Sequence, residues 1–164
     1  MALTNLQAAI IIAIVVIVVA VVGFLATRSS IDSWYKSLKR SKLSPPNSVF
    51  GIIWSILYLG IGVSTYIAYS SAKSDEQRQN VMNIFVLQMS LNLMWSATFF
   101  GSRSTRGGVL VILALLSAIL YNVNYFFSIN QVAGWILVPY LLWVSYATLL
   151  NVDIVRINPM QGCS

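Results

Sequence analysis

The sequence predicts an all-α integral membrane protein, built as a bundle of five transmembrane helices within one domain over residues 1–164. Of the 164 residues, 58% are hydrophobic and only 9% are charged, whereas soluble proteins carry about 25% charged residues. The mean hydropathy is +0.79. Apolar stretches near the length of about 20 residues that spans a bilayer recur along the chain. Almost all of the chain is therefore expected in or near the bilayer.

Polar or glycine-rich segments separate the five predicted helices. The helices are expected over residues 6–27, 48–70, 80–101, 107–127 and 132–156. The segments "SSAKSDEQRQN", "GSRSTRGG" and "SINQVAG" are predicted to be the last three connections. Pro139 lies near the start of the last helix. Because proline has no backbone N–H, a kink or a late start of that helix is expected.

The first connection, over residues 27–47, is the longest. Its segment "IDSWYKSLKR" predicts a short interfacial helix, with Trp34 and Tyr35 at the level of the lipid headgroups. The connection ends in the pair Pro45-Pro46. A proline pair is not compatible with a helix interior but fits immediately before the next helix.

The basic residues predict the orientation of the chain. The first and third connections and the C-terminal end share one side of the bundle and hold eight basic residues: Arg28, Lys36, Lys39, Arg40, Lys42, Arg103, Arg106 and Arg156. The other side holds only Lys73 and Arg78. Because basic loops stay on the cytoplasmic side, the C-terminus is predicted to be cytoplasmic. The net charge of +6 then indicates membrane lipid, and no nucleic acid, as a partner.

Several kinds of chemistry are excluded by residue type. The chain has no histidine and a single cysteine, Cys163, so zinc sites and Cys/His nucleophile pairs are not expected, and no metal is predicted. The acidic residues all fall in connections or at helix ends: Asp32, Asp75, Glu76 and Asp153. Without a carboxylate near the middle of a span, neither proton-coupled transport nor catalysis by paired carboxylates is expected.

Three of the predicted helices carry a stripe of aromatic and polar residues on one face. These stripes are Gly51, Trp54, Tyr58 and Thr65; Gln88, Asn92, Trp95 and Phe99; and Pro139, Trp143, Ala147 and Asn151, with Leu150 beside the last. Amides and small residues hold membrane helices together, so helix packing is one interpretation. The other is a cavity for a flat, largely apolar ligand that stacks on aromatic rings.

Four segments resemble the translocator protein family, also called the tryptophan-rich sensory proteins or peripheral benzodiazepine receptors. In chain order they are "SWYKSLKRSKLSPP", "FGIIWSILYLGIG", "QMSLNLMWSATFFGSR" and "VAGWILVPYLLWVSYATLLN". The resemblance extends from about residue 23 to residue 158. It implies five transmembrane helices around a ligand pocket that the long first connection caps. It also implies a homodimer, no resident cofactor, and ligands such as protoporphyrin IX, haem-like tetrapyrroles or, in animal members, cholesterol.

The resemblance also assigns candidate ligand-binding residues by motif. Trp54 and Trp143 match tryptophans implicated in porphyrin binding and in light-dependent porphyrin breakdown, and would be the catalytic residues if breakdown occurs. The full candidate set is Trp34, Pro45, Trp54, Tyr58, Gln88, Asn92, Trp95, Phe99, Trp143, Ala147 and Leu150. Asn92 is expected to orient the ligand through its amide, and Trp95 to offer a stacking wall.

Two positions depart from the family pattern. Leu43 stands where the family has a tryptophan in the first connection, and Val152 stands where the sterol motif of animal members has a tyrosine. The expected function is a non-enzymatic membrane receptor or carrier for tetrapyrroles and related hydrophobic ligands. Light- and oxygen-dependent porphyrin degradation, with chemistry belonging to the ligand, and sterol transport are the alternatives. The expected location is the mitochondrial outer membrane or another organelle membrane in a eukaryote, or the cell envelope in a bacterium.

Overall fold

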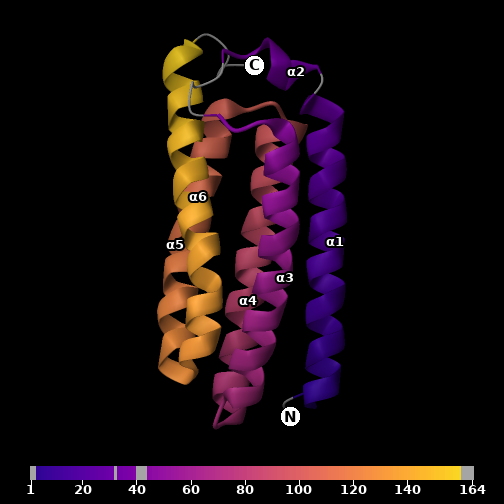
Figure 1. The fold of residues 1–164 in the computed structure, drawn as a ribbon, viewed down its shortest axis with the longest axis vertical. Coiled ribbons are helices and arrows are strands. Elements are labelled where there is room, and N and C mark those ends of the chain that lie inside the picture. The colour runs from indigo at the N-terminus through magenta and orange to yellow at the C-terminus, as the bar shows by residue number, and fades with distance from the viewer. Residues whose placement is uncertain (1–2, 32, 40–43, 160–164) are drawn as a thin grey trace.

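The protein is an elongated bundle of long helices (Figure 1). The structure, a computed structural model, describes residues 3–31, 33–39 and 44–159. The elements are α1 (Asn5–Ile31), α2 (Trp34–Ser37), α3 (Asn47–Ser71), α4 (Asp75–Ser96), the π-helix η1 (Ala97–Gly101), α5 (Thr105–Ile129) and α6 (Gln131–Ile157). Five of the helices are long and apolar enough to cross a membrane. The prediction of an all-α protein with five spans is therefore confirmed.

The five long helices differ in how much of their surface they bury. Helix α5 packs against α6 and α4, whereas α3 packs against α6, α1 and α4. Helix α1 lies at the edge of the bundle and packs mainly against α3, α4 and η1 (Figure 1). Only about a fifth of its most apolar stretch is buried, 22%. Its apolar side chains therefore mostly face outward, as suits a helix in contact with lipid.

Helix α4 begins five residues before the predicted residue 80, within the segment that was expected to be a turn. The hydroxyl of Ser74 accepts a hydrogen bond of 3.2 Å from the backbone N–H of Gln77. Asp75 and Glu76 occupy the first turn, where the helix dipole favours negative charge. The pattern Ser-x-x-Gln is a capping signal that places the helix start at Asp75.

The last connection is also shorter than predicted, because only Asn130 separates α5 from α6. Its side-chain oxygen accepts hydrogen bonds from the backbone N–H groups of Val132 and Ala133, at 2.9 and 3.3 Å. This cap starts α6 at Gln131, and the helix continues through Pro139. The helix thus starts within one residue of the predicted residue 132, and of the two expectations for Pro139 the late start does not occur, because the proline lies inside the helix.

The π-helix η1 brings two consecutive phenylalanines into the core. The backbone N–H of Ser102 donates to the carbonyl of Ala97, five residues back, over 2.8 Å. The hydroxyl of Ser30 on α1 donates to the carbonyl of Phe100 over 2.7 Å. Phe99 and Phe100 are 2% and 4% exposed. A Cβ atom on Gly108 would lie 2.6 Å from the Phe99 ring, so α5 approaches η1 this closely only with glycine there.

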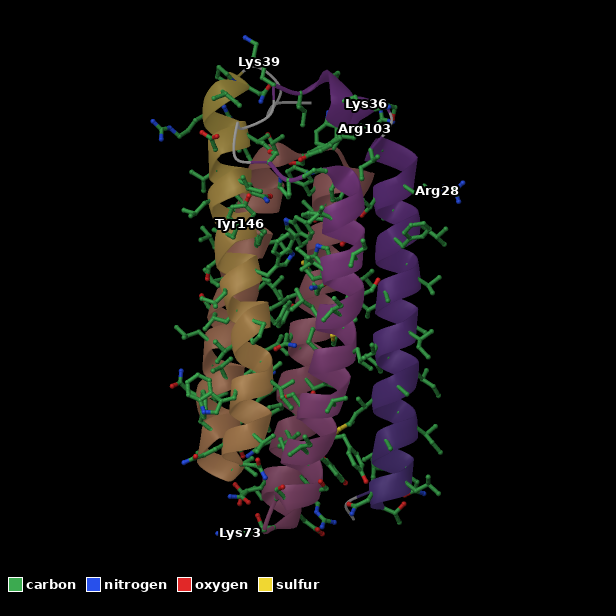
Figure 2. All side chains as sticks on the ribbon, viewed as in Figure 1. Arg28, Lys36, Lys39, Lys73, Arg103 and Tyr146 are labelled. Atoms are coloured by element: carbon green, nitrogen blue, oxygen red, sulfur yellow. The ribbon has the colours of Figure 1, made fainter. Side chains whose placement is uncertain are left out.

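The two ends of the bundle differ in charge. Arg28, Lys36, Lys39 and Arg103 lie at one end and Lys73 at the opposite end (Figure 2). Helix α2 lies at the basic end (Figure 1). The unequal distribution of basic residues along the sequence thus becomes a basic end of the folded bundle.

Candidate ligand site

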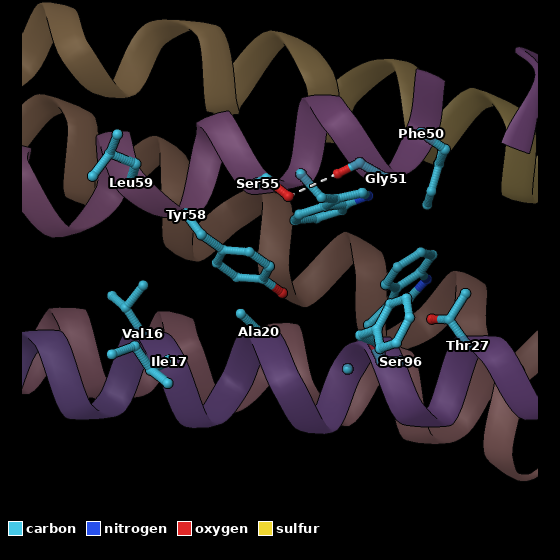
Figure 3. Close-up of a pocket in the computed structure, with 14 residues that line it drawn as sticks. Val16, Ile17, Ala20, Thr27, Phe50, Gly51, Ser55, Tyr58, Leu59 and Ser96 are labelled. Carbon is cyan, nitrogen blue, oxygen red and sulfur yellow. Dashed lines mark hydrogen bonds between the residues drawn. The ribbon is translucent and has the colours of Figure 1, made fainter. Parts of the chain in front are cut away.

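A cavity of about 380 Å³ lies between α1 and α3, with α4 behind it (Figure 3). Most of its lining is apolar. The lining residues are Val16, Ile17, Ala20, Gly23, Phe24 and Thr27 of α1; Phe50, Gly51, Trp54, Ser55, Tyr58 and Leu59 of α3; and Trp95 and Ser96 of α4. The volume falls within the range of about 300–1,000 Å³ that small-molecule pockets occupy.

The cavity opens sideways, toward the lipid. Three residues on its rim, Ile17, Phe24 and Leu59, are 60%, 62% and 69% exposed. Because α1 packs mainly against α3, α4 and η1, the opening lies where the edge helix meets the bundle. A hydrophobic molecule dissolved in the bilayer therefore has a direct route to the cavity.

Small residues on the two facing helices leave the space between them unfilled. A Cβ atom added to Gly51 would meet nothing within 4 Å. Ala20 and Gly23 supply little side chain from α1 (Figure 3). The hydroxyl of Ser55 turns back to its own helix and donates to the carbonyl of Gly51 over 3.0 Å. The space therefore follows from residue size at these positions.

Three aromatic rings from α3, α4 and η1 stack in series beside the cavity. The Trp54 and Trp95 rings lie 6.1 Å apart at an interplanar angle of 24°. The Trp95 and Phe99 rings follow at 5.8 Å and 21°. Such offset stacking is a favourable arrangement for aromatic rings. Trp95 and Phe99 are four residues apart, which places their rings on one helix face, and there they continue the stack that Trp54 begins.

Hydrogen bonds fix the position of Trp95. Its indole N–H donates to the side-chain oxygen of Asn151 over 3.2 Å. The amide of Asn151 in turn donates to the carbonyl of Ala147 over 2.8 Å. The indole N–H of Trp54, by contrast, is buried and has no hydrogen-bond partner among the residues that the structure describes. The Trp54 side chain therefore lines the cavity with its ring, whereas its N–H is shielded from the cavity.

Asn92 joins three helices through its side-chain amide. It accepts a hydrogen bond from the Tyr58 hydroxyl over 2.8 Å and donates one to the Tyr140 hydroxyl over 2.9 Å. Asn92 itself is 1% exposed and does not line the cavity, whereas Tyr58 does. In this structure Asn92 therefore acts on the cavity through Tyr58, whose ring it holds in place.

Trp143 lies apart from the cavity that Trp54 lines. It lines a second, shallower groove between α3 and α6, together with Pro139. Phe50 packs against both indoles, with ring centroids 6.2 Å from Trp54 and 5.6 Å from Trp143. The Trp143 indole N–H is likewise buried without a partner in the described part of the chain. The two tryptophans are therefore linked through Phe50 and are not walls of one cavity.

The remaining predicted residues lie in the core or in the first connection. Gln88 accepts a hydrogen bond of 2.6 Å from Asn122 of α5. Ala147 and Leu150 are 2% and 6% exposed in the core. Pro45 is half-buried in the first connection, just before α3. Of the eleven predicted residues, the structure brings Trp54, Tyr58 and Trp95 together at the cavity lining.

The first connection contacts the aromatic wall and the end of α6. The expected short helix is present as α2, and its Trp34 ring packs edge-on against Phe99 with centroids 5.6 Å apart. Asn158 accepts from the backbone N–H of Lys39 over 3.0 Å and donates to its carbonyl over 2.9 Å. Leu43 and Lys42 lie outside the described residues. These contacts place the connection over the Phe99 end of the wall.

Sequence reasoning did not identify the α1 wall of the cavity. Helix α1 is apolar at nearly every position, so no stripe of polar or aromatic residues marks the face that turns toward the cavity. Ala20 and Gly23, spaced by three, were the available signal, because small residues mark close approaches between membrane helices. They lie on the face of α1 that lines the cavity.

The fold and site define a class: an α-helical protein with five potential spans and an aromatic-walled cavity open to the membrane. The sequence matches the TspO/MBR family over residues 11–157, and the chain belongs to that family. It is therefore an integral membrane protein.

Relatives of this chain come from archaea, bacteria and animals. It is 33% identical to a tryptophan-rich protein TspO of Archaeoglobus fulgidus over 143 residues, covering 87% of this chain and 92% of that protein. It is 36% identical to a tryptophan-rich protein TspO of Chlorobaculum tepidum over 129 residues, 77% of this chain and 81% of that one. The human translocator protein is 27% identical over 126 residues, 76% of this chain and 75% of that protein.

Proposed function

We propose that this protein is a membrane receptor or carrier that binds tetrapyrroles of the protoporphyrin IX type, and related flat hydrophobic molecules, in the cavity between α1 and α3. The observation that carries the proposal is the stacked pair of Trp54 and Trp95, which both line an apolar cavity of about 380 Å³; Phe99 stacks on Trp95 but does not itself line the cavity. A flat conjugated ligand gains both area burial and stacking energy from such a wall.

The experiment is a tryptophan-fluorescence titration with protoporphyrin IX in detergent. The Trp54→Phe variant tests the wall, and Trp135→Phe is the matched control, because Trp135 is 65% exposed and packs on Phe127 away from the cavity. We expect saturable binding that Trp54→Phe weakens about 5- to 10-fold, from a stacking difference of roughly 1 kcal/mol or slightly more. Quenching that never saturates, or that both variants change equally, would refute the proposal.

Light-dependent porphyrin breakdown is a second candidate function, favoured by the placement of the Trp54 indole at the cavity lining. It predicts a product with a shifted absorption spectrum that forms only under light and oxygen. Formation should depend on Trp54 more than on Trp143, because only Trp54 lines the cavity. A rate that Trp54→Phe leaves unchanged would argue against this function.

Sterol binding is the remaining alternative for the ligand, and the same titration with cholesterol in place of porphyrin would test it.

We further propose that the protein forms a homodimer and that its basic end faces the cytoplasm. Because the chain has one cysteine, a membrane-impermeant thiol reagent reports the side on which Cys163 lies. Labelling of intact cells before permeabilisation would contradict the orientation.

A further inference from the structure

The ligand cavity has a polar corner above Gly23 of α1. Leaving aside the backbone of its own helix and its chain neighbours, the two heavy atoms nearest to a Cβ atom built on Gly23 are hydroxyl oxygens. They are the Oγ atom of Ser96 at 3.5 Å and the Oη atom of Tyr58 at 3.7 Å. All three residues line the cavity. Glycine at this position therefore leaves uncovered two oxygens that a larger residue on α1 would cover.

The Tyr58 oxygen can accept a hydrogen bond from a ligand. Its own proton is donated to the side-chain oxygen of Asn92 over 2.8 Å, and the amide of Asn92 also donates to the Tyr140 hydroxyl. A phenol oxygen keeps acceptor lone pairs after it has donated its proton. Figure 3 shows the Tyr58 hydroxyl directed into the space between α3 and α1. The bond to Asn92 therefore makes Tyr58 an acceptor at a fixed position.

The Ser96 hydroxyl can donate to a ligand. The hydroxyls of Ser55, Thr65 and Thr148 donate to carbonyls four residues back in their own helices, over 3.0, 2.8 and 2.7 Å, as is usual for serine and threonine within helices. The Ser96 hydroxyl makes no such bond and has no other partner in the part of the chain that the structure describes. The residue is 5% exposed. A nearly buried hydroxyl without a partner is stabilised by a ligand that accepts its proton.

The rest of the lining determines which charge the bound group can carry. The lining residues, all of which the structure describes, include no acidic or basic side chain. An ionised group that enters an apolar cavity without a counter-charge loses its hydration at a large cost. A neutral hydroxyl group both donates and accepts, so it matches the acceptor of Tyr58 and the donor of Ser96. A carboxylate has no proton for Tyr58 and finds no cation.

We infer that Tyr58 and Ser96, above Gly23, form a subsite for a neutral hydroxyl group of the ligand. The inference rests on the proposed function in that it takes this cavity as the ligand site. It narrows the ligand class to flat apolar molecules that stack on Trp54 and Trp95 and carry an uncharged hydroxyl at one edge. A tetrapyrrole that enters the cavity does so by the edge opposite its carboxylates.

The test compares two fluorescent probes, pyrenemethanol and ethylpyrene, which carry their substituents at the same ring position. They differ by a hydroxyl in place of a methyl group. Each is titrated against the full chain in detergent, with energy transfer from tryptophan as the readout. Because both probes partition into the same micelles, the ratio of their affinities is compared between variants. Ser96→Ala should lower the preference for the alcohol about 5-fold, the effect of one neutral hydrogen bond.

Ser145→Ala is the matched control for the serine variant. The Ser145 hydroxyl donates to the carbonyl of Leu141 within α6 over 2.8 Å, and the residue does not line the cavity. The control therefore removes a hydroxyl of the same kind from another part of the bundle. It should change the preference for the alcohol less than about twofold.

Gly23→Ala tests the same subsite without removing either hydroxyl. Its methyl group would make ordinary van der Waals contacts with the Ser96 and Tyr58 oxygens, at 3.5 and 3.7 Å, so the fold should tolerate it while both oxygens become covered. The preference for the alcohol should fall about 10-fold. Gly60→Ala is the matched control, because its Cβ atom would lie 3.7 Å from Ile136, outside the cavity. It should keep the preference within about twofold.

The outcomes separate this subsite from the proposed function. The subsite is overturned if pyrenemethanol does not bind saturably, or if Ser96→Ala and Gly23→Ala leave the affinity ratio unchanged. Protoporphyrin IX is titrated against the same samples. Saturable porphyrin binding with an unchanged probe ratio would refute the subsite and leave the proposed function standing. A preference for the alcohol that both variants lower, without any porphyrin binding, would support the subsite and refute the tetrapyrrole ligand.

Discussion

Gly51 offers the sharpest test of the ligand cavity, because filling it should affect binding without disturbing the fold. A Cβ atom at this position would meet nothing within 4 Å, and the residue lines the cavity. The Gly51→Leu side chain would therefore start into open space at the cavity lining. Its backbone carbonyl would still accept the hydrogen bond from Ser55.

The effects on stability and on binding should have opposite signs. Replacing glycine by leucine within a helix stabilises it by about 0.5–1 kcal/mol, so Gly51→Leu should unfold at the same or a slightly higher temperature. A ligand that must share the cavity with the new side chain is overpacked, at a cost of about 1–3 kcal/mol. This cost corresponds to an affinity loss of roughly 5- to 150-fold.

The assays are the protoporphyrin IX titration and thermal unfolding followed by circular dichroism in the same detergent. Gly51→Ala is the control, because it gains most of the helix propensity but adds only a methyl group to the cavity. Its affinity should fall much less than that of Gly51→Leu. If Gly51→Leu bound the porphyrin as tightly as the unaltered protein, the ligand would not occupy this cavity and the reasoning would be refuted.

Four further substitutions test polar contacts within the bundle and to the first connection. Asn92→Ala removes the hydrogen-bond partner of two tyrosine hydroxyls. We expect the free energy of unfolding to fall by about 1–3 kcal/mol and porphyrin to bind more weakly. An unchanged free energy of unfolding would contradict this. Asn158→Ala removes both hydrogen bonds to the backbone of Lys39 and should speed proteolysis of the first connection without lowering the unfolding temperature of the long helices much. Gln88→Leu or Asn122→Leu alone should lower the free energy of unfolding by about 1–3 kcal/mol, because each leaves the other buried amide without its hydrogen bond. The free energy of unfolding of the double variant should lie within about 1 kcal/mol of that of the unaltered protein. Additive costs in a double-mutant cycle would show that the pair does not interact.

The sequence determined the spans, because crossing a bilayer depends on local hydropathy and length. Five apolar stretches of sufficient length were visible, and five helices of that kind form. The caps at Ser74 and Asn130 were also local signals, since each side chain accepts from N–H groups two or three residues ahead. The polar composition of both segments predicts turns, whereas the caps begin the helices within these segments.

The sequence also indicated the aromatic faces of α3 and α4, through residues spaced three or four apart. Trp54 and Trp95 do meet beside one cavity. The partners of these residues were decided only by the fold. The amide of Asn92 is taken by two tyrosines from α3 and α6, and Phe50 separates Trp143 from Trp54. The two hydrogen bonds of Asn92 join residues 34 and 48 positions apart, beyond the reach of helical periodicity.

The inward face of α1 is the clearest case that only tertiary structure decided. In a soluble helix, polar and apolar faces differ because one side meets water. In a bilayer the lipid is as apolar as the protein core, so side chains toward either side look alike in sequence. Val16 of the cavity wall and Val18, which is 50% exposed, are the same residue type two positions apart. Their different surroundings arise from where α3 and α4 pack, for which α1 itself offers only the small residues Ala20 and Gly23 as a local signal.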